Sequence, residues 1–317
     1  MDKSTVIEVP VLVIGFNRPE IVRQCIDKLR ESKPVNMYFA CDGPRENKEN
    51  ENLLVDEVRS IMEKESDWLC NKHYKYNEKN KGCEVTVSEA VTWVLEDNEY
   101  VIVIEDDIIA PYSFLKFAQQ MLYQYKDQNN VYQVTSNNVT PLDFPNDEDY
   151  CFSIYGHIWG WATWRRAWSH FDLYVNDYKQ TLATIDSRDD LTKVEKKHFR
   201  KTCQRLIKVE NSDKPIPKNT WDVVWSYIKL RDGGLTIVPK VHLSSNVGVV
   251  GLHSKVQTDS HFRSYEEDFE VAKHPQKVER CFEYDDYHYN HYLKKPPYLI
   301  RQWRRGVGFL KRKLQGK

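Results

Sequence analysis

The sequence predicts an α/β protein with a mostly parallel central sheet flanked by helices. Short runs of consecutive apolar residues recur over the first 110 positions, as expected of strands that are buried on both faces. Segments with apolar residues at helical spacing separate these runs, and each run ends in polar or turn-forming residues. Helices that join successive strands place those strands parallel in one sheet, so this order predicts a largely parallel arrangement.

The expected elements form a β-α-β-α-β-α-β series over about 110 residues, followed by a more varied second half. Asn17 is expected to cap the first helix, with Pro19 in its first turn, and Thr220 to cap a later one. The expected strands are 9–16, 35–41, a short edge strand at 73–76, 101–104, 131–135 and 235–239. The expected helices are 21–29, 53–62, one that starts at 80–82, 113–125, 189–211 and one that starts at 220.

The composition is that of a soluble globular protein. The chain has 317 residues, of which 40% are hydrophobic and 29% are charged. Its seven cysteines form no C-x-x-C pair, which favours reduced thiols in a cytoplasm. The N-terminal stretch lacks the apolar core of a signal peptide, and no apolar run approaches the ~18 residues that a membrane-spanning helix needs. We therefore expect a cytoplasmic protein.

Three consecutive acids, Glu105, Asp106 and Asp107, follow the strand expected at 101–104. Adjacent carboxylates repel one another unless a cation or a set of hydrogen-bond donors neutralises them. The carboxyl end of a central strand is also where open α/β sheets bind ligands. The acids thus indicate a divalent ion, Mg²⁺ or Mn²⁺, that carries a phosphorylated ligand. An acidic surface junction between strand and loop is the alternative.

The loops that follow the other early strands are also polar. They contain Asn17-Arg18, Asp42-Gly43 and Asn80-Lys81-Gly82. Loops after parallel strands meet at one rim of the sheet, so Arg18, Asp42 and Lys81 are expected near the three acids. The chain has neither a G-x-G-x-x-G after its first strand nor a G-x-x-x-x-G-K-[ST] motif. This rim would instead offer partners to a cation, a phosphate group and a sugar or base hydroxyl.

An aromatic segment lies in the middle of the chain. Trp159, Trp161, Trp164 and Trp168 fall within ten residues, next to a pair of arginines. Such rings stack on sugars or bases, or they form the core of a second lobe. Further on, Asp222 is expected in the first turn of a helix, where the helix dipole favours its ionised form. His253 ends a glycine-containing loop and is a candidate contact to a metal or a phosphate.

The end of the chain is basic and aromatic. After Asp286 it contains nine Lys and Arg residues and no acid. Residues 294–317 interleave these bases with apolar side chains, a composition that suits an anionic membrane surface. Nucleic acid is the other partner for such a patch, and a solvated tail is the third interpretation. Because no RNA-binding or zinc pattern occurs, we expect no nucleic-acid partner.

Five motifs together resemble the GT-A nucleotide-sugar glycosyltransferases, in particular the group of N-acetylglucosaminyltransferase I and its bacterial relatives. The motifs occur in that family's order over about residues 9–255 and read PVLVIGFNRP (10–19), FACDGPR (39–45), VIEDDIIAP (103–111), GHIWGWATWRRAW (156–168) and WDVVW (221–225). The resemblance implies a GT-A, Rossmann-like fold that binds the nucleotide sugar in residues 1–140. It places acceptor binding and catalysis in 141–255 of the same domain, and leaves 256–317 as a C-terminal extension.

The resemblance also implies roles for single residues in an inverting transfer from a UDP-sugar to a glycan or a lipid-linked glycan. It implies that Asp107 binds Mn²⁺ (or Mg²⁺) and that Asp222 acts as general base. The other implied roles are Glu105 and Asp106 at the ribose and the metal-bound water, Arg18 at the diphosphate, Asp42 at the uracil N3–H, Lys81 and Trp161 at the donor, and His253 at the metal or diphosphate.

Two other functions remain open at this point. A sugar-nucleotide nucleotidyltransferase would use a similar sheet, but it needs a glycine- and base-rich loop after the first strand, and here that loop is Gly15-Phe16-Asn17-Arg18-Pro19. A non-catalytic glycan-binding protein would use the tryptophans and the basic tail, but it would not need three adjacent carboxylates. Binding that persists when metal is chelated would favour it.

Overall fold

The computed structural model describes residues 5–248 and 265–294. Its strands are β1 (Val11–Gly15), β2 (Asn36–Cys41), β3 (Asn71–Tyr76), β4 (Tyr100–Glu105), β5 (Ile108–Ile109), β6 (Val131–Thr135), β7 (Tyr150–Ser153), β8 (Trp161–Trp164), β9 (Leu235–Pro239) and β10 (Ser245–Asn246). Its α-helices are α1 (Pro19–Ser32), α2 (Glu51–Lys64), α3 (Cys83–Asp97), α4 (Tyr112–Gln124), α5 (Arg165–Trp168), α6 (Tyr178–Thr184), α7 (Lys193–Glu210), α8 (Trp221–Asp232) and α9 (Phe282–His288). Short helical turns occur at η1 (Pro145–Asp147), η2 (Ile185–Ser187) and η4 (Tyr289–Leu293).

One eight-stranded sheet runs through the described part of the chain, in the order β3-β2-β1-β4-β8-β6-β9-β7. The pairs β3–β2, β2–β1, β1–β4 and β6–β9 are parallel. Strand β8 lies antiparallel between β4 and β6, and β7 is antiparallel to β9. The predicted α/β class with a mostly parallel sheet flanked by helices is confirmed. The first half has the predicted β-α-β-α-β-α-β order.

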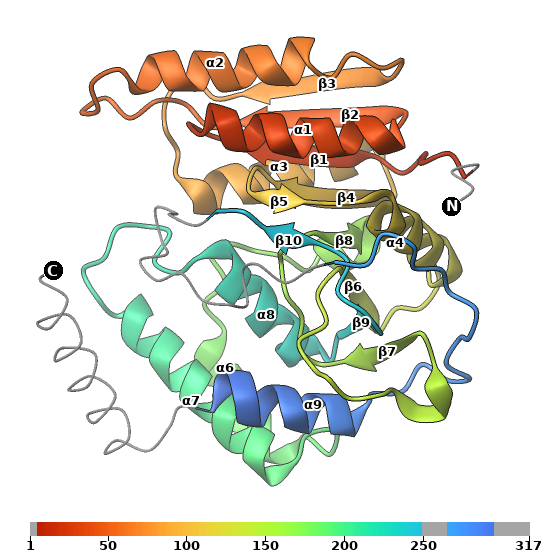
Figure 1. Cartoon of the computed structure of the whole chain (residues 1–317). Coiled ribbons are helices and arrows are strands. Elements are labelled where there is room, and N and C mark those ends of the chain that lie inside the picture. The colour runs from red at the N-terminus through yellow and green to blue at the C-terminus, as the bar shows by residue number, and fades with distance from the viewer. Residues whose placement is uncertain (1–4, 249–264, 295–317) are drawn as a thin grey trace, which may run out of the picture.

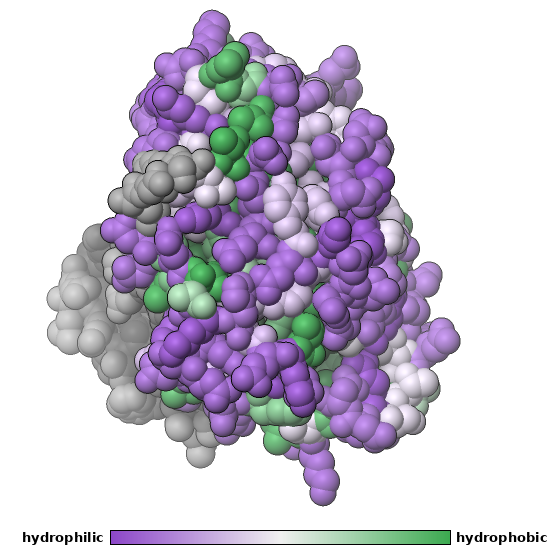
Figure 2. Space-filling model, turned by 90° about the vertical axis from the view of Figure 1, so that its right-hand side faces the viewer, coloured by the Kyte–Doolittle hydropathy of each residue, from purple (hydrophilic) through white to green (hydrophobic). Residues whose placement is uncertain are grey.

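Helices cover both faces of the sheet, as Figure 1 shows with α1 in front of the sheet and α3 behind it. Helix α1 packs against α2 and α4, whereas α3 packs against α5 and α8. Strands β1, β6, β8 and β9 are buried along their whole length because the helices exclude water from both sides. The face of the molecule in Figure 2 is mostly hydrophilic, and its hydrophobic residues form small separate patches.

Two predicted helix caps differ from the structure. Pro19 is the first residue of α1, as predicted, but the capping position belongs to Arg18 and no side chain caps this helix. Asn17 instead donates from Nδ2 to Oε1 of Glu51, at 2.9 Å. Thr220 has the position of an N-cap before α8, but its side chain makes no capping hydrogen bond. The amides that open α1 and α8 are therefore left without a side-chain cap near the polar rim of the sheet.

Candidate functional site

A pocket of about 610 Å³ opens at the carboxyl ends of β1, β2 and β4. Its lining comes from residues 14–18 at the end of β1, from Asp42 and Arg45 after β2, from the start of α3, from 105–107 at the end of β4, and from Trp159. Five predicted site residues therefore line one pocket, namely Arg18, Asp42, Glu105, Asp106 and Asp107. They meet because parallel strands bring their following loops to one edge of the sheet.

The three acids are fixed beside the end of β1. The Asp106 amide donates to the carbonyl of Ile14 at 2.9 Å, which extends the β1–β4 pairing to the first acid after the strand. Arg18 then contacts two of the carboxylates. Its Nε lies 3.2 Å from Oδ2 of Asp106, its Nη1 lies 3.2 Å from Oδ2 of Asp107, and its Nη2 also pairs with Asp106. One guanidinium thus faces two carboxylates.

The carboxyl groups that line the site outnumber its arginines. Burial raises the pKa of Glu105 to about 8, and the charges of Asp107, Asp106 and Asp222 add to this effect. Burial also raises the pKa of Asp106, to about 6, against the opposing charge of Arg18. Arg18 alone does not offset this group of carboxylates, so the pocket favours an additional cation.

Asp107 lies at the contact between the acids and the strand pair β5–β10. The amide of Val247 donates to the Asp107 carbonyl at 2.8 Å, just after β10. Gly248 follows, so close to the Asp107 carboxylate that a Cβ on this glycine would stand 2.3 Å from Oδ2. Only a glycine leaves the Asp107 carboxylate in this position without a shift of the neighbouring chain.

The carboxylate of Asp42 is surrounded by donors from its own protein. It accepts from the backbone amides of Gly43, Lys81 and Gly82 at 2.9 to 3.0 Å. It also accepts from the side-chain amides of Asn77 at 3.0 Å and Asn80 at 2.8 Å. Five donors fill the roughly four lone-pair sites of a carboxylate. In this arrangement Asp42 holds the loop before α3 at the pocket wall, and its carboxylate has no site left for a base N–H.

Lys81 and Trp161 are not among the residues that line the pocket. The Lys81 ammonium pairs with Glu89 at 2.6 Å, on the outside of α3. Trp161 belongs to β8, where it is fully buried and its ring lies 5.5 Å from that of Trp221. Its Nε1 has no hydrogen-bond partner. The tryptophan that does line the pocket is Trp159, from the loop before β8.

Asp222 lies in the first turn of α8, as predicted. It is half-buried and is not itself part of the pocket lining. Its charge nonetheless acts on two residues that line the pocket, because it helps to raise the pKa values of Glu105 and Cys83. The packing of α8 against α3 brings its first turn to this side of the pocket.

The site also contains a cation that the sequence interpretation did not assign a role. Arg45 lines the pocket and contacts the buried carboxylate of Glu51, with Nε 3.0 Å from Oε2. The hydrogen bonds from Arg45 hold the pKa of Glu51 at about 2. The same carboxylate accepts from Asn17, so Glu51 fixes two pocket-lining side chains at once. Arg45 is the last residue of the FACDGPR motif, so this motif was the feature of the sequence that could have indicated a role for it.

A divalent ion fits this donor set with help from its ligand. In the part of the chain that the structure describes, no group of three or more His, Cys, Asp or Glu side chains is arranged to hold a metal ion. Mg²⁺ in nucleotide sites commonly takes only one or two carboxylates, and phosphate oxygens and water complete its shell. Asp107 provides an oxygen ligand of this kind, and Glu105 and Asp106 lie beside it. We therefore find the residues compatible with a shared metal–phosphate site.

Two of the expected contacts concern residues that the structure does not describe. His253 lies outside the described residues, as do positions 295–317 of the segment predicted to bind an anionic membrane. Within residues 5–248 and 265–294, no helix is long and apolar enough to cross a membrane.

Comparisons with known proteins give distant structural similarities only. No protein-family model and no curated protein matches the chain. A mannosyltransferase from Pyrobaculum calidifontis, solved with GDP-Man and Mn²⁺, is 13% identical at a TM-score of 0.36, over 73% of this chain and 70% of its own. The 4-diphosphocytidyl-2C-methyl-D-erythritol synthase of Anaerococcus prevotii is 12% identical at 0.29, over 71% of this chain and 97% of its own. Both TM-scores are below 0.5, so proposals about this chain rest on its own geometry.

Proposed function

We propose that this protein is a metal-dependent, inverting glycosyltransferase of the GT-A type, which transfers a sugar from a UDP-sugar to a hydroxyl of a glycan or lipid-linked glycan. One observation carries the proposal. The pocket at the carboxyl ends of β1, β2 and β4 combines an acidic strip with two arginines, polar loop amides and a tryptophan. These are the groups that a metal-bound diphosphate, a nucleoside and a sugar ring each require.

The diphosphate would bind beside the acids and the Arg18 guanidinium that pairs with them. Asp107 is the proposed protein ligand of Mn²⁺ or Mg²⁺, with Glu105 and Asp106 toward the ribose and the metal-bound water. When bound, the ion supplies positive charge to the phosphate oxygens and so stabilises the departing UDP. Arg18 already faces Asp106 and Asp107, so it would add a second positive charge at the same place.

The nucleoside would lie against the loop that Asp42 holds. Because the Asp42 carboxylate is filled by five donors, we assign it to positioning this loop. Asn80 and Gly82 of the same loop line the pocket and are the proposed contacts to the base. We assign the donor platform to Trp159 in place of Trp161, since Trp159 is the one that lines the pocket.

Asp222 is the proposed general base. It would accept the proton of the acceptor hydroxyl while that oxygen attacks the anomeric carbon from the side opposite UDP. One displacement of this kind inverts the anomeric configuration. The position of Asp222 in the first turn of α8 supports the assignment, because the packing of α8 against α3 brings this carboxylate close enough to act on Glu105 and Cys83 of the pocket.

A transfer assay tests the proposal. We expect UDP release from one member of a panel of UDP-sugars when glycan or lipid-linked acceptors and Mn²⁺ are present. Asp222→Asn should lower that rate by ~10²-fold or more, the usual contribution of a positioned base, and should leave UDP binding nearly intact. Ser226→Ala, at an exposed position of the same helix, is the matched control and should retain full activity.

Other outcomes would contradict this function. Full activity of Asp222→Asn would disprove the assignment of the base. Release of pyrophosphate from a nucleoside triphosphate and a sugar phosphate would indicate the nucleotidyltransferase alternative. Glycan binding that persists with chelated metal, without turnover of any nucleotide sugar, would indicate the non-catalytic alternative.

A further inference from the structure

We propose that residues 280–292 hold the pocket-lining loop 156–160 in place, and that His288 is the positioning residue through which this segment acts. That this loop contacts substrate rests on the proposed function. That residues 280–292 hold the loop in place does not. The segment lies outside the stretch that resembles the glycosyltransferases, so the inference gives this extension a part in building the site.

The loop connects β7 with β8 and reaches the pocket through Ile158 and Trp159. Its backbone is held from one side by polar side chains. The His157 carbonyl accepts from Nε2 of Gln133 at 2.7 Å and from Oγ1 of Thr135 at 3.0 Å. The Trp159 carbonyl accepts from Oγ of Ser244 at 2.8 Å. These contacts fix carbonyl groups of the loop and leave the placement of the His157 side chain to other partners.

The other side of the loop meets the C-terminal segment. Nε2 of His157 lies 3.1 Å from Nε2 of His288, and the two ring centroids are 5.1 Å apart. His288 is buried and stacks on Tyr155 with a centroid distance of 4.6 Å. Burial lowers the pKa of His288 to about 3, so its imidazole is neutral. A neutral imidazole has one donor and one acceptor nitrogen, which allows a single hydrogen bond between the two rings.

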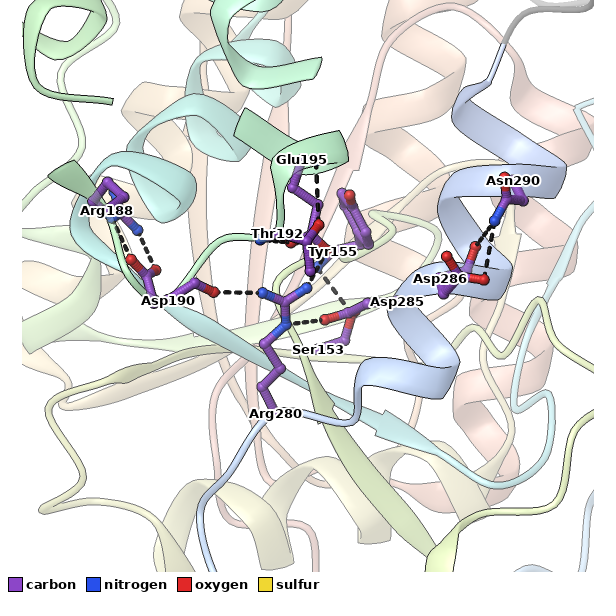
Figure 3. A network of polar contacts seen from close by, with 10 residues as sticks. All are labelled: Ser153, Tyr155, Arg188, Asp190, Thr192, Glu195, Arg280, Asp285, Asp286 and Asn290. Atoms are coloured by element: carbon purple, nitrogen blue, oxygen red, sulfur yellow. Dashed lines mark hydrogen bonds and ion pairs between the residues drawn. The ribbon is translucent and has the colours of Figure 1, made fainter. Parts of the chain in front are cut away.

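The segment that carries His288 begins with a buried network of polar contacts around Arg280. Arg280 places Nε 2.6 Å from Oδ2 of Asp285, pairs with Glu195 of α7, and donates from Nη1 to the Asp190 carbonyl at 2.7 Å. Asp285 also accepts from Ser153 of β7. Figure 3 shows Arg280 pointing between Glu195 and Asp285, where three parts of the chain meet. The side chains of Arg280, Glu195 and Asp285 are almost fully buried.

Two further contacts keep the segment against the body of the protein. The amide of Cys281 donates to the Phe152 carbonyl of β7 at 2.7 Å. At the far end, the hydroxyl of Tyr292 donates to the Val139 carbonyl at 2.9 Å. The segment is therefore fastened before and after His288, so the position of His288 is fixed relative to the loop.

Hydrogen–deuterium exchange of the full chain tests this without any substrate. His288→Phe keeps an aromatic ring on Tyr155 but removes Nε2. We expect exchange of the Ser136 amide, which donates to the Gly160 carbonyl of the loop at 3.0 Å, to become faster by about threefold to tenfold, as for one lost buried hydrogen bond. His291→Phe is the matched control, since Nδ1 of His291 lies 2.9 Å from the Tyr287 carbonyl in its own helical turn. It should leave the loop unchanged. His288→Gln, which restores a donor and an acceptor, should restore protection.

Calorimetry of UDP binding in the presence of Mn²⁺ then tests whether the contact between residues 280–292 and the loop affects the pocket. His288→Phe should weaken UDP affinity by about threefold to tenfold. The same change made in Trp159→Ala should have a smaller effect, since two residues that act through one element are not additive. His157→Phe removes the contact from the loop side and serves if His288→Phe does not fold.

The outcomes separate the two proposals. Unchanged exchange of the Ser136 amide for both His288→Phe and His157→Phe would overturn the positioning role. Faster exchange in a protein that never binds UDP would uphold the positioning role of His288 and contradict the proposed UDP-sugar donor. Faster exchange with unchanged UDP affinity would overturn the claim that the segment serves the pocket.

Discussion

At the scale of single residues, the proposed metal site depends on how Asp107 is held. Its carboxylate lies between the Arg18 guanidinium and the backbone of Gly248, while Glu105 beside it has a raised pKa because burial and neighbouring acids disfavour its charge. A carboxylate held in this way is preorganised for a cation. The position of Asp107 should therefore matter as much as its charge.

Gly248→Ala tests this position. The new Cβ would lie 2.3 Å from Oδ2 of Asp107, so the carboxylate or the chain after β10 must move. We expect weaker binding of UDP in the presence of Mn²⁺, by about tenfold or more, because a metal ligand that moves by a fraction of an ångström loses its geometry. Calorimetry measures the effect. Ser245→Ala, three residues earlier, is the control, and equal affinity of Gly248→Ala and wild type would contradict the account.

Several residues of the site were predictable from the sequence and others were not. The order of the strands was enough to predict that Arg18, Asp42 and the three acids meet at one rim, because loops after parallel strands lie at the same edge of the sheet. The choice of Trp161 was not supported by the position of its side chain, because alternate residues of a strand face opposite ways and the sequence did not reveal that β8 was a buried strand. The five donors on Asp42 come from loop geometry, which no spacing rule predicts.

At the scale of elements, the predictions succeeded where patterns were long and regular. β6 and β9 have the predicted bounds, and β1, β2 and β4 lie where apolar runs indicated strands. Strand β8 was missed, since its four residues, Trp161–Trp164, look like part of an aromatic cluster. It runs antiparallel between two parallel halves, and its partners lie about 30 to 60 positions away.

Helix α8 contains a buried cation whose titration makes a prediction. Nζ of Lys229 donates to Oε1 of Gln133 and to Oγ1 of Thr236, both at 2.7 Å. Burial lowers the pKa of Lys229 to about 7, against 10.5 for the free side chain. Between these values the unfolded chain holds a proton on this lysine that the folded chain has lost, so the contribution of Lys229 to the free energy of unfolding should rise as the pH increases from 7.

Lys229→Met should flatten this rise, because the variant has no proton to lose at that position. Urea unfolding at pH 7 and pH 9 measures the free energy of unfolding for both proteins. Trp225 still donates to Gln133 in the variant, which limits the number of unpaired groups. A variant with the same increase between the two pH values would show that Lys229 is not the titrating group.

At the scale of the whole molecule, the described part of the C-terminal extension is integrated into the core. Arg280 is surrounded by Asp285, Glu195 and the Asp190 carbonyl, so residues from α7 and from the extension share one buried network (Figure 3). The sequence placed a boundary near 256, since only the stretch before it resembles a known family. Charge pairing between residues 85 positions apart gives no signal in a single sequence.

Arg280→Met should destabilise the whole protein. The change leaves the buried carboxylates of Asp285 and Glu195 without their cation, which typically costs about 3–5 kcal/mol. Urea unfolding measures the loss. Arg200→Met removes an exposed ion pair with Asp186 and should leave stability nearly unchanged. A loss no larger than that of the control would mean that the network does not hold the extension.

The most direct test of the central claim is calorimetric titration of UDP into the full chain, with Mn²⁺ and again with a chelator. We expect binding with the metal, none with the chelator, and loss of binding in Asp107→Ala. Asp97→Ala, at an exposed position of α3, should bind as the wild type does. Absence of UDP binding under both conditions, or binding that is equal with and without metal, would contradict a metal-dependent UDP-sugar site.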